Sequence, residues 1–329
     1  MAMVKANAYG HGILPIAQNL SKADYFGVAC LEEAIALRNA GIKQAIVLMS
    51  GFHAAEELDV LLSQQIQPVV YDWQQLELLN RLPTAQNLKV WLKIDTGMHR
   101  LGFPLVEAER AWQYLKASEI VDNITVMTHF ASSNRVDDPL MVKQQQRFIE
   151  ATRTMGGLRS AANSAALMQY PETRFDIVRP GLMLYGVSPR DGISAKADDL
   201  LPVMTLKSRV ISIHTIEPGE TVGYSATWTA ARTSRIATVS IGYGDGYPQC
   251  APNGTPVKIH GKIVPLAGRV SMDTLTIDVT DVPKTAVGDE VILWGDSLPV
   301  EQVAEAMKAS MYGLLTGVTA RVRRSLVSA

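Results

Sequence analysis

The sequence predicts an α/β protein in which a (β/α)8 barrel precedes a mostly antiparallel β domain. Up to about residue 187, short β-rich runs alternate with amphipathic helical runs, which indicates parallel strands joined by crossover helices. About eight such units in fewer than 200 residues fit a TIM-like barrel better than an open doubly wound sheet. Beyond about residue 200 the long helices stop, and β-rich stretches separated by turns predict the second domain.

The expected barrel strands are short, β-rich and each followed by a turn: Met3–Ala8, Tyr25–Ala29, Ala45–Ser50, Pro68–Tyr71, Val90–Asp95, Ile124–Phe130, Arg159–Asn163 and Phe175–Arg179. Apolar residues at three-four spacing predict the helices between them, among them Leu31–Ala40, Ala54–Gln64, Trp73–Arg81 and Met141–Met155. We expect the barrel to occupy residues 1–198. Residues 199–329 form the β domain, with strands at Met204–His214, Arg235–Ile241, Val257–Leu266, Leu275–Val279 and Val291–Trp294 and a helix near Val300–Leu315.

The composition is that of an ordinary globular protein. The formal net charge of −1 gives no electrostatic reason to expect nucleic acid or an anionic membrane surface as a partner. No apolar run reaches the roughly 18 residues that span a bilayer. Cys30 and Cys250 lie far apart and match no metal or redox spacing, so we expect buried thiols, no metal site and a reducing, cytoplasmic location.

Lys5 is the first candidate for chemistry. It lies in the first expected strand, before a Gly-His-Gly turn, and period-two alternation places Met3, Lys5 and Asn7 on one face. On an inward strand face, burial lowers the pKa of a lysine toward neutrality, and such an amine can form a Schiff base with an aldehyde cofactor. The pattern also fits a strand-end lysine whose amine reaches water.

Further candidates lie where other expected strands end, which is the position of reactive groups in barrels. Ser164 is predicted to cap a helix after the seventh strand, and Gly181 lets a backbone amide approach a ligand after the eighth. Both features also fit ordinary capping and turn chemistry. Arg100 follows a glycine turn and suits a carboxylate, while His129 ends the sixth strand. The run Gly242–Gly246 lacks the lysine and the strand-turn-helix setting of a phosphate-binding loop.

Six segments, in order across both domains, resemble bacterial alanine racemases, which are fold-type III pyridoxal-phosphate enzymes. Val4–Gly12 resembles the segment that carries the cofactor in that family. The other matching segments are Asp95–Gly102, Arg179–Gly181, Val222–Tyr224, Gly242–Pro248 and Gly268–Asp273. Members of the family usually carry a further segment before this lysine, which the barrel domain at residues 1–198 then lacks.

The resemblance implies a two-base amino-acid racemase, an isomerase that interconverts L-alanine and D-alanine in a homodimer with shared active sites. Lys5 would hold pyridoxal 5'-phosphate and exchange the α-proton on the D-alanine side, and Tyr224 of the partner subunit would act on the L-alanine side. Arg100 and the Met272 amide would hold the substrate carboxylate, and Tyr243 would narrow the entrance. The product D-alanine is a peptidoglycan precursor, although the sequence leaves a biosynthetic and a catabolic role open.

The resemblance also implies the cofactor contacts. Tyr9, Ser164, Gly181, Leu182 and Tyr312 would surround the phosphate, and Lys93 matches a position that is carbamylated in some members. Arg179 would face the pyridine nitrogen, with His129 beside it as part of a relay toward the tyrosine base. Because arginine stays charged, that nitrogen remains an unprotonated acceptor, and the carbanion is reprotonated at Cα rather than transaminated.

Three alternatives remain open at this stage. A broad-specificity racemase of the same fold differs only in its range of substrates. An amino-acid decarboxylase of the same plan would carry a cysteine followed closely by aspartate, whereas Cys250 precedes Ala-Pro-Asn-Gly. A pyridoxal-phosphate-binding homeostasis protein would be a barrel alone, without the region that contains Tyr224 and Met272.

Overall fold

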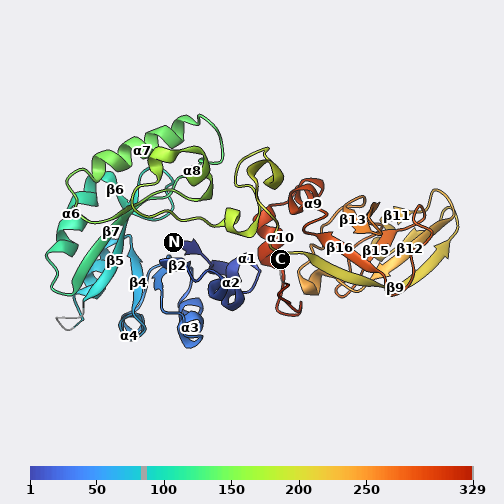
Figure 1. The fold of residues 1–329 in the computed structure, drawn as a ribbon, viewed down its shortest axis with the longest axis horizontal. Helices are drawn as coiled ribbons and strands as arrows, with labels where there is room; N and C mark the ends of the chain where they lie inside the picture. Colours follow the sequence, from blue (N-terminus) through green and yellow to red (C-terminus); the bar gives the residue numbers. More distant parts are fainter. Residues whose placement is uncertain (83–86, 328–329) are drawn as a thin grey trace. The chain divides into compact units, whose positions relative to one another are not determined.

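The computed structural model describes residues 1–82 and 87–327, and the chain divides into two compact units (Figure 1). The first unit comprises Met1–Ala8, Gly12–Leu184 and Ser188–Ile193. The second comprises Tyr9–His11, Tyr185–Val187 and the chain from Ser194 onward.

The first unit is a parallel sheet of the barrel type, as predicted. Its strands pair in the order β1 (Ala2–Met3), β2 (Tyr25–Val28), β3 (Ala45–Leu48), β4 (Ile66–Val70), β5 (Leu88–Asp95), β7 (Val121–Met127) and β8 (Arg159–Ser160), with β6 (Phe103–Pro104) beside β5. The connecting helices are α2 (Ile13–Asn19), α3 (Leu31–Asn39), α4 (Ala55–Ser63), α5 (Trp73–Leu79), α6 (Leu105–Lys116), α7 (Pro139–Ala151) and α8 (Ser164–Gln169). Large side chains such as Phe26, Trp91 and Phe148 are fully buried in this unit.

The expected eighth strand, Phe175–Arg179, does not form a regular strand. Arg179 makes a single parallel bridge with Asn163, and its amide donates to the Ala162 carbonyl at 2.9 Å. The Pro180 carbonyl accepts the Met3 amide at 3.0 Å, so this segment still joins the last strand to the first. Pro180 has no amide hydrogen to donate, which limits ladder formation at this point.

The predicted strand Met3–Ala8 is wrong beyond Met3, because β1 ends there and α1 (Lys5–Tyr9) is a single left-handed turn. Ala6, Asn7, Ala8 and Tyr9 all have φ between 51° and 53°. Lys5 and Asn7 therefore do not alternate along a strand. Three hydrogen bonds hold the turn: Ala8 N to Val4 O at 2.8 Å, Gly12 N to Asn7 O at 2.9 Å, and Ile13 N to Asn7 Oδ1 at 2.8 Å.

The second unit is mostly antiparallel, as predicted. Its main sheet has the order β14 (Lys262–Pro265), β13 (Pro256–Ile259), β16 (Glu290–Trp294), β9 (Leu206–Ile216), β12 (Ser234–Val239) and β15 (Leu275–Asp278), and β10 (Thr221–Val222) pairs with β11 (Trp228–Thr229). The expected strand Val257–Leu266 is a hairpin that turns at His260 and Gly261, both with positive φ. The single helix expected near Val300–Leu315 is two helices, α9 (Val300–Met307) and α10 (Met311–Gly317), because Lys308 is left-handed and ends the first.

Both cysteines are exposed, so the expectation of buried thiols is wrong. Cys30 lies at the start of α3, where the chain leaves a strand end, and Cys250 lies in a loop of the second unit. Neither position belongs to a strand or helix face that packs into a core. Among the described residues, no helix is long and apolar enough to cross a membrane, and no cluster of potential metal ligands is found.

Candidate active site

Cationic side chains gather after the strands of the first unit. Lys93 lies near the end of β5 and Arg100 follows it. Arg179 is the last residue of the segment Phe175–Arg179, and Lys5 follows β1. Burial is the main cause that lowers the pKa of Lys5, and Arg100 and Arg179 lower it further. A larger fraction of the Lys5 amine is therefore unprotonated and nucleophilic at neutral pH. The sequence predicted this lowered pKa for a lysine on a strand face, and the structure places Lys5 in a turn.

Arg179 is fixed in place by its surroundings. Its side chain is buried, and its guanidinium donates to Ser160 Oγ and Thr128 O at 2.6 Å each and to Ala161 O at 3.1 Å. His129 Nδ1 lies 3.3 Å from the same guanidinium. Burial, and then the charge of Arg179, hold the pKa of His129 well below its usual value, so this imidazole is neutral and can accept from Arg179.

The loop that carries Arg100 is built on Asp95. One Asp95 oxygen accepts the amides of Gly97, Met98 and His99 at 2.9, 3.1 and 3.1 Å, and the other lies 3.0 Å from His99 Nδ1. Gly102 closes the loop with φ 126°, and a Cβ at that residue would lie 2.6 Å from the Asp95 nitrogen. Burial alone would raise the pKa of Asp95, but the hydrogen bonds from the loop outweigh it and lower the pKa. The Arg100 side chain is exposed, and the hydrogen bonds of Asp95 fix the loop residues that precede it.

Ser164 is not the helix cap that the sequence predicted. The cap of α8 is Asn163, whose side chain accepts the Ala166 amide at 3.0 Å, and Ser164 is the first helical residue. Ser164 Oγ instead accepts the Gly181 amide at 2.7 Å. The Gly181 amide is therefore already engaged, and the Ser164 hydroxyl hydrogen is the donor that remains for an anion.

Leu182 is buried in the first unit, and the remaining predicted site residues lie in the second unit. The ring of Tyr9 is buried and stacks on Tyr185 with centroids 4.7 Å apart, and the Tyr312 ring is 6.0 Å away. Burial raises the pKa of both Tyr9 and Tyr312, so these phenols stay protonated donors. Tyr224 is the most open of the set, with 71% of its surface exposed in the short turn Tyr224–Ala226.

Two of the matched motifs of the second unit meet at Tyr243 and Met272. The Tyr243 amide donates to the Ser271 carbonyl at 3.0 Å, and the Gly244 amide donates to the Met272 carbonyl at 2.8 Å. A Cβ at Gly242 would lie 2.3 Å from the Ser271 oxygen, so this approach requires glycine. Met272 is 52% exposed and Tyr243 is 37% exposed, which leaves both side chains available on the surface of this unit.

Sequence reasoning missed the residues that support the site. Asp95 could have been found as an aspartate followed by Thr-Gly at a strand end, a typical turn signal. Gln144 is fully buried and donates to Thr96 Oγ1 at 3.2 Å and to the His129 carbonyl at 3.0 Å, and no local signal marks it. Glu33 was also missed, because its partner Asn7 lies 26 positions away in the sequence.

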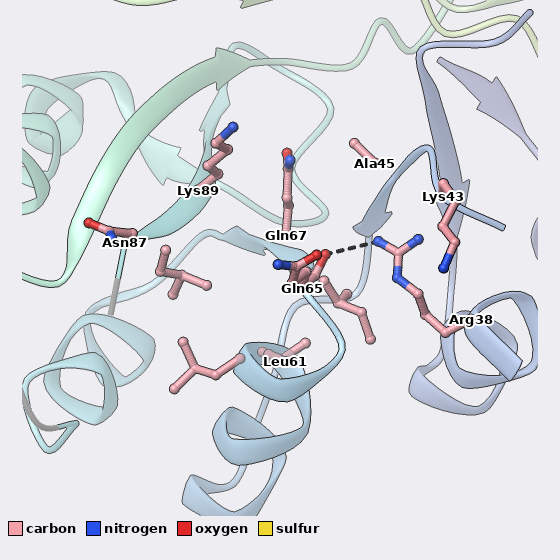
Figure 2. Close-up of a pocket in the computed structure, with 11 residues that line it drawn as sticks. Arg38, Lys43, Ala45, Leu61, Gln65, Gln67, Asn87 and Lys89 are labelled. Atoms are coloured by element: carbon pink, nitrogen blue, oxygen red, sulfur yellow. Dashed lines mark hydrogen bonds between the residues drawn. The ribbon is translucent and has the colours of Figure 1, made fainter. Parts of the chain in front are cut away.

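A cavity of about 480 Å³ lies elsewhere in the first unit, where β3, β4 and β5 begin (Figure 2). Arg38 lines this cavity. Its guanidinium donates to the backbone carbonyls of Gln64, Ile42, Gln44 and Gln65 at 2.7 to 3.1 Å. Gln64 is the C-terminal cap of α4, so the guanidinium of Arg38 joins the end of α4 to the loop that follows α3. None of the predicted site residues lines this cavity, and we assign it a structural role.

Replacing Arg38 should therefore destabilise the protein without touching the active site. We expect Arg38→Gln to lower the free energy of unfolding by about 2 kcal/mol, because charged hydrogen bonds to partly buried carbonyls are lost. Urea denaturation checks this value. Lys43→Gln, in the same cavity, is the control and should change stability by less than about 0.5 kcal/mol. Equal stability of the two variants would contradict the structural role.

Lys93 gives a prediction about pH. Burial is the main cause that lowers its pKa to about 8, with Arg179 and Arg100 adding to the effect. The unfolded chain holds this proton up to about pH 10.5, so between pH 8 and 10.5 it binds more protons than the folded protein, and stability rises with pH there. Below pH 8 the burial penalty is fully present.

In CO₂-free buffer, Lys93→Met should therefore be more stable than the wild type at pH 7, by about 3 kcal/mol at most. The difference should shrink as the pH rises toward 10.5, the ordinary pKa of lysine. Urea titrations of both proteins across this range measure it. A stability difference that does not change with pH would show that the Lys93 amine is not desolvated.

The residues of the first unit fit a ligand that carries an aldehyde and an anionic group. Lys5 supplies an amine with a lowered pKa, and the surrounding cations favour negative charge. The Ser164 hydroxyl supplies a donor near the start of a helix, and Arg179 supplies a fixed positive charge. This set defines a barrel enzyme of the pyridoxal-phosphate-dependent class.

Comparison with known proteins identifies the family. Residues 1–189 match the alanine racemase N-terminal domain and residues 203–326 match the alanine racemase C-terminal domain. A curated alanine racemase from Aeromonas hydrophila is 45% identical over 323 residues, covering 98% of this chain and 90% of the relative. One from Nitrosococcus oceani is 47% identical over 327 residues, covering 99% and 92%. The chain belongs to the alanine racemase family, whose members are isomerases that depend on pyridoxal phosphate.

Solved structures agree with this assignment. The biosynthetic alanine racemase of Pseudomonas aeruginosa has a TM-score of 0.94 at 42% identity, covering 98% of this chain and 90% of that one. The alanine racemase of Bartonella henselae, solved with covalently bound pyridoxal phosphate, has a TM-score of 0.89 at 31% identity, covering 99% and 92%. The match to a second domain speaks against the lone-barrel binding protein.

Proposed function

We propose that this chain racemises alanine with pyridoxal 5'-phosphate held on Lys5. The observation that carries the proposal is the buried Lys5 amine, whose pKa is lowered by burial, Arg100 and Arg179 in a unit that matches the family's first domain. Pyridoxal phosphate, when bound, supplies an electron-withdrawing ring that acidifies the α-hydrogen of an attached amino acid. The protein supplies the binding groups and the two bases.

In this proposal each binding group has a defined task. The Ser164 hydroxyl and the Tyr9 and Tyr312 phenols would bind the phosphate together with the Leu182 backbone. Gly181, whose amide already donates to Ser164 Oγ, would let the chain approach the phosphate closely. Arg179, fixed by Ser160 and Thr128, stays positively charged beside the pyridine nitrogen. His129 is neutral and orients Arg179, so the proposed relay operates by hydrogen bonding and not by a charged imidazole.

Proton transfer uses two groups on opposite sides of the substrate. Lys5 removes or returns the α-proton on the D-alanine side, because its amine is partly unprotonated. Tyr224 acts on the L-alanine side, and its 71% exposure suits a residue that enters the active site of a partner subunit. Arg100 and the Met272 amide hold the substrate carboxylate, and Tyr243 narrows the entrance. In this proposal the enzyme is a cytoplasmic homodimer, and its product D-alanine is a peptidoglycan precursor.

Lys93 is proposed as a site of carbamylation. Its pKa of about 8 leaves part of the amine unprotonated at neutral pH, which is the form that reacts with CO₂. A carbamate there would place a negative charge near Arg100 and Arg179, the two cations that lower the Lys93 pKa. Carbon NMR of the protein in isotope-labelled bicarbonate tests this. We expect a carbamate signal in the wild type that Lys93→Met lacks, and a wild type without that signal would refute the proposal.

The function is tested by a visible spectrum and a chiral assay on the purified protein with added pyridoxal phosphate. We expect a yellow protein that racemises alanine from either enantiomer. A panel of amino acids separated by chiral chromatography decides between alanine specificity and a broad-specificity racemase. Release of CO₂ from basic amino acids without racemisation would contradict the proposal.

A further inference from the structure

We infer that Glu33 is a positioning residue that fixes the left-handed turn after Lys5. Glu33 lies in the first turn of α3, and its carboxylate accepts two backbone amides from different loops. Glu33 Oε1 accepts the Asn7 amide at 3.0 Å, and Oε2 accepts the Ala29 amide at 2.9 Å. The residue thus joins the turn after β1 to the loop after β2. Its importance for catalysis rests on the proposed role of Lys5.

The turn needs such a support because its backbone is strained. Four consecutive residues without a glycine, Ala6 to Tyr9, hold φ near 50°. Each residue in this region costs roughly 1–2 kcal/mol, and such geometry persists only where the surroundings determine it. Asn7 is the centre of the turn, and its amide, carbonyl and side chain are all hydrogen-bonded, to Glu33, Gly12 and Ile13 respectively.

Glu33 also balances the charges around Lys5. The charges of Arg100, after β5, and of Arg179, at the end of the segment Phe175–Arg179, both lower the pKa of the Lys5 amine. His129, after β7, is neutral, and its own pKa is lowered by Lys5 among other groups. Glu33, from α3, contributes the negative charge that opposes the two arginines at this amine. Removing that charge should leave Lys5 more strongly deprotonated.

Two variants separate the two effects of Glu33. Glu33→Gln keeps the side-chain length but removes the charge and leaves one acceptor, so both the turn and the Lys5 amine should respond. Glu33→Asp keeps the charge on a side chain too short to reach both amides, so mainly the turn should respond. Glu32→Gln, an exposed neighbour on the same helix with the same change of charge, is the matched control.

The first two readouts use the protein without added cofactor. Amide hydrogen exchange at Asn7 should become at least about tenfold faster in Glu33→Gln and Glu33→Asp, because the open turn gains about 1.4 kcal/mol relative to the closed one. The pH midpoint for acylation of the Lys5 amine, followed by mass spectrometry, should move to lower pH in Glu33→Gln alone. The Glu32→Gln control should match the wild type in both. With cofactor present, kcat of Glu33→Gln should fall roughly 10- to 100-fold.

Unchanged Asn7 exchange in Glu33→Gln, or an unchanged Lys5 midpoint in that variant, would overturn the inference. If Glu33→Gln does not fold, the Asn7 exchange of Glu33→Asp decides the positioning role. Failure of the proposed function can be distinguished from failure of this inference. A wild-type protein without racemase activity would refute the function, and both cofactor-free readouts would still test Glu33. A purely structural glutamate would lower the melting temperature without moving the Lys5 midpoint, which also contradicts the inference.

Discussion

Lys5→Ala is expected to remove both cofactor attachment and racemisation. Positioned proton transfer alone contributes about 10²–10⁴-fold to a rate, and this variant also loses the amine that holds the cofactor covalently. Activity should therefore fall by about 10⁴-fold or more in both directions. The visible absorbance of the protein-bound cofactor should be lost as well. Chiral chromatography and a spectrum of the dialysed protein measure the two effects.

The control for this variant is Lys22→Ala, an exposed lysine in the same unit. It should keep wild-type activity and colour, because Lys22 belongs to none of the contacts that hold the site. Lys5→Ala protein that stays yellow after dialysis and racemises alanine at the wild-type rate would contradict the proposed role of Lys5. A circular dichroism spectrum of Lys5→Ala that matches the wild type would show that its loss of activity does not come from unfolding.

Tyr224→Phe should produce a loss that depends on the enantiomer. The phenylalanine keeps the ring and removes the hydroxyl that would exchange the proton on the L-alanine side. We expect racemisation to fall about 10²–10⁴-fold. In deuterated water, D-alanine should still exchange its α-hydrogen through Lys5, whereas exchange from L-alanine should be lost. Proton NMR of the alanine α-position follows both reactions.

Tyr114→Phe is the matched control, because this tyrosine lies on α6 and packs against Trp73, away from every proposed site residue. It should exchange both enantiomers as the wild type does. A Tyr224→Phe variant that exchanges L-alanine and D-alanine equally would assign the second base to another group. Because Tyr224 is proposed to serve a partner subunit, the assay is done at a protein concentration where the oligomeric state is measured.

Regular patterning and the matched motifs predicted the architecture well. Alternating β-rich and helical runs predicted the parallel sheet, and the loss of long helices near residue 200 predicted the antiparallel one. The sequence placed Lys5 inside the strand Met3–Ala8, whereas the strand ends at Met3 and Lys5 begins a left-handed turn. Hydrophobic periodicity distinguishes strands from helices and carries no signal for a left-handed turn made of Ala6–Tyr9.

Unlike Asp95, whose contacts are local, the long-range supports of the site could not be predicted because they join residues far apart in sequence. Glu33 reaches back to Asn7, and Gln144 reaches Thr96 across 48 positions. Such contacts form only because the folded barrel brings the ends of neighbouring strands together, and local sequence patterns do not report this. The predicted cap at Ser164 failed for a more local reason, because the preceding Asn163 is an equally good cap and takes the position.

The central claim is that the amine of Lys5 carries the cofactor, and its most direct test is chemical. The protein is incubated with pyridoxal phosphate, reduced with borohydride to make the linkage permanent, digested and analysed by mass spectrometry. We predict the pyridoxyl group on the peptide that contains Lys5, with little on the other lysines. Modification of a different lysine, with Lys5 unlabelled, would contradict the account.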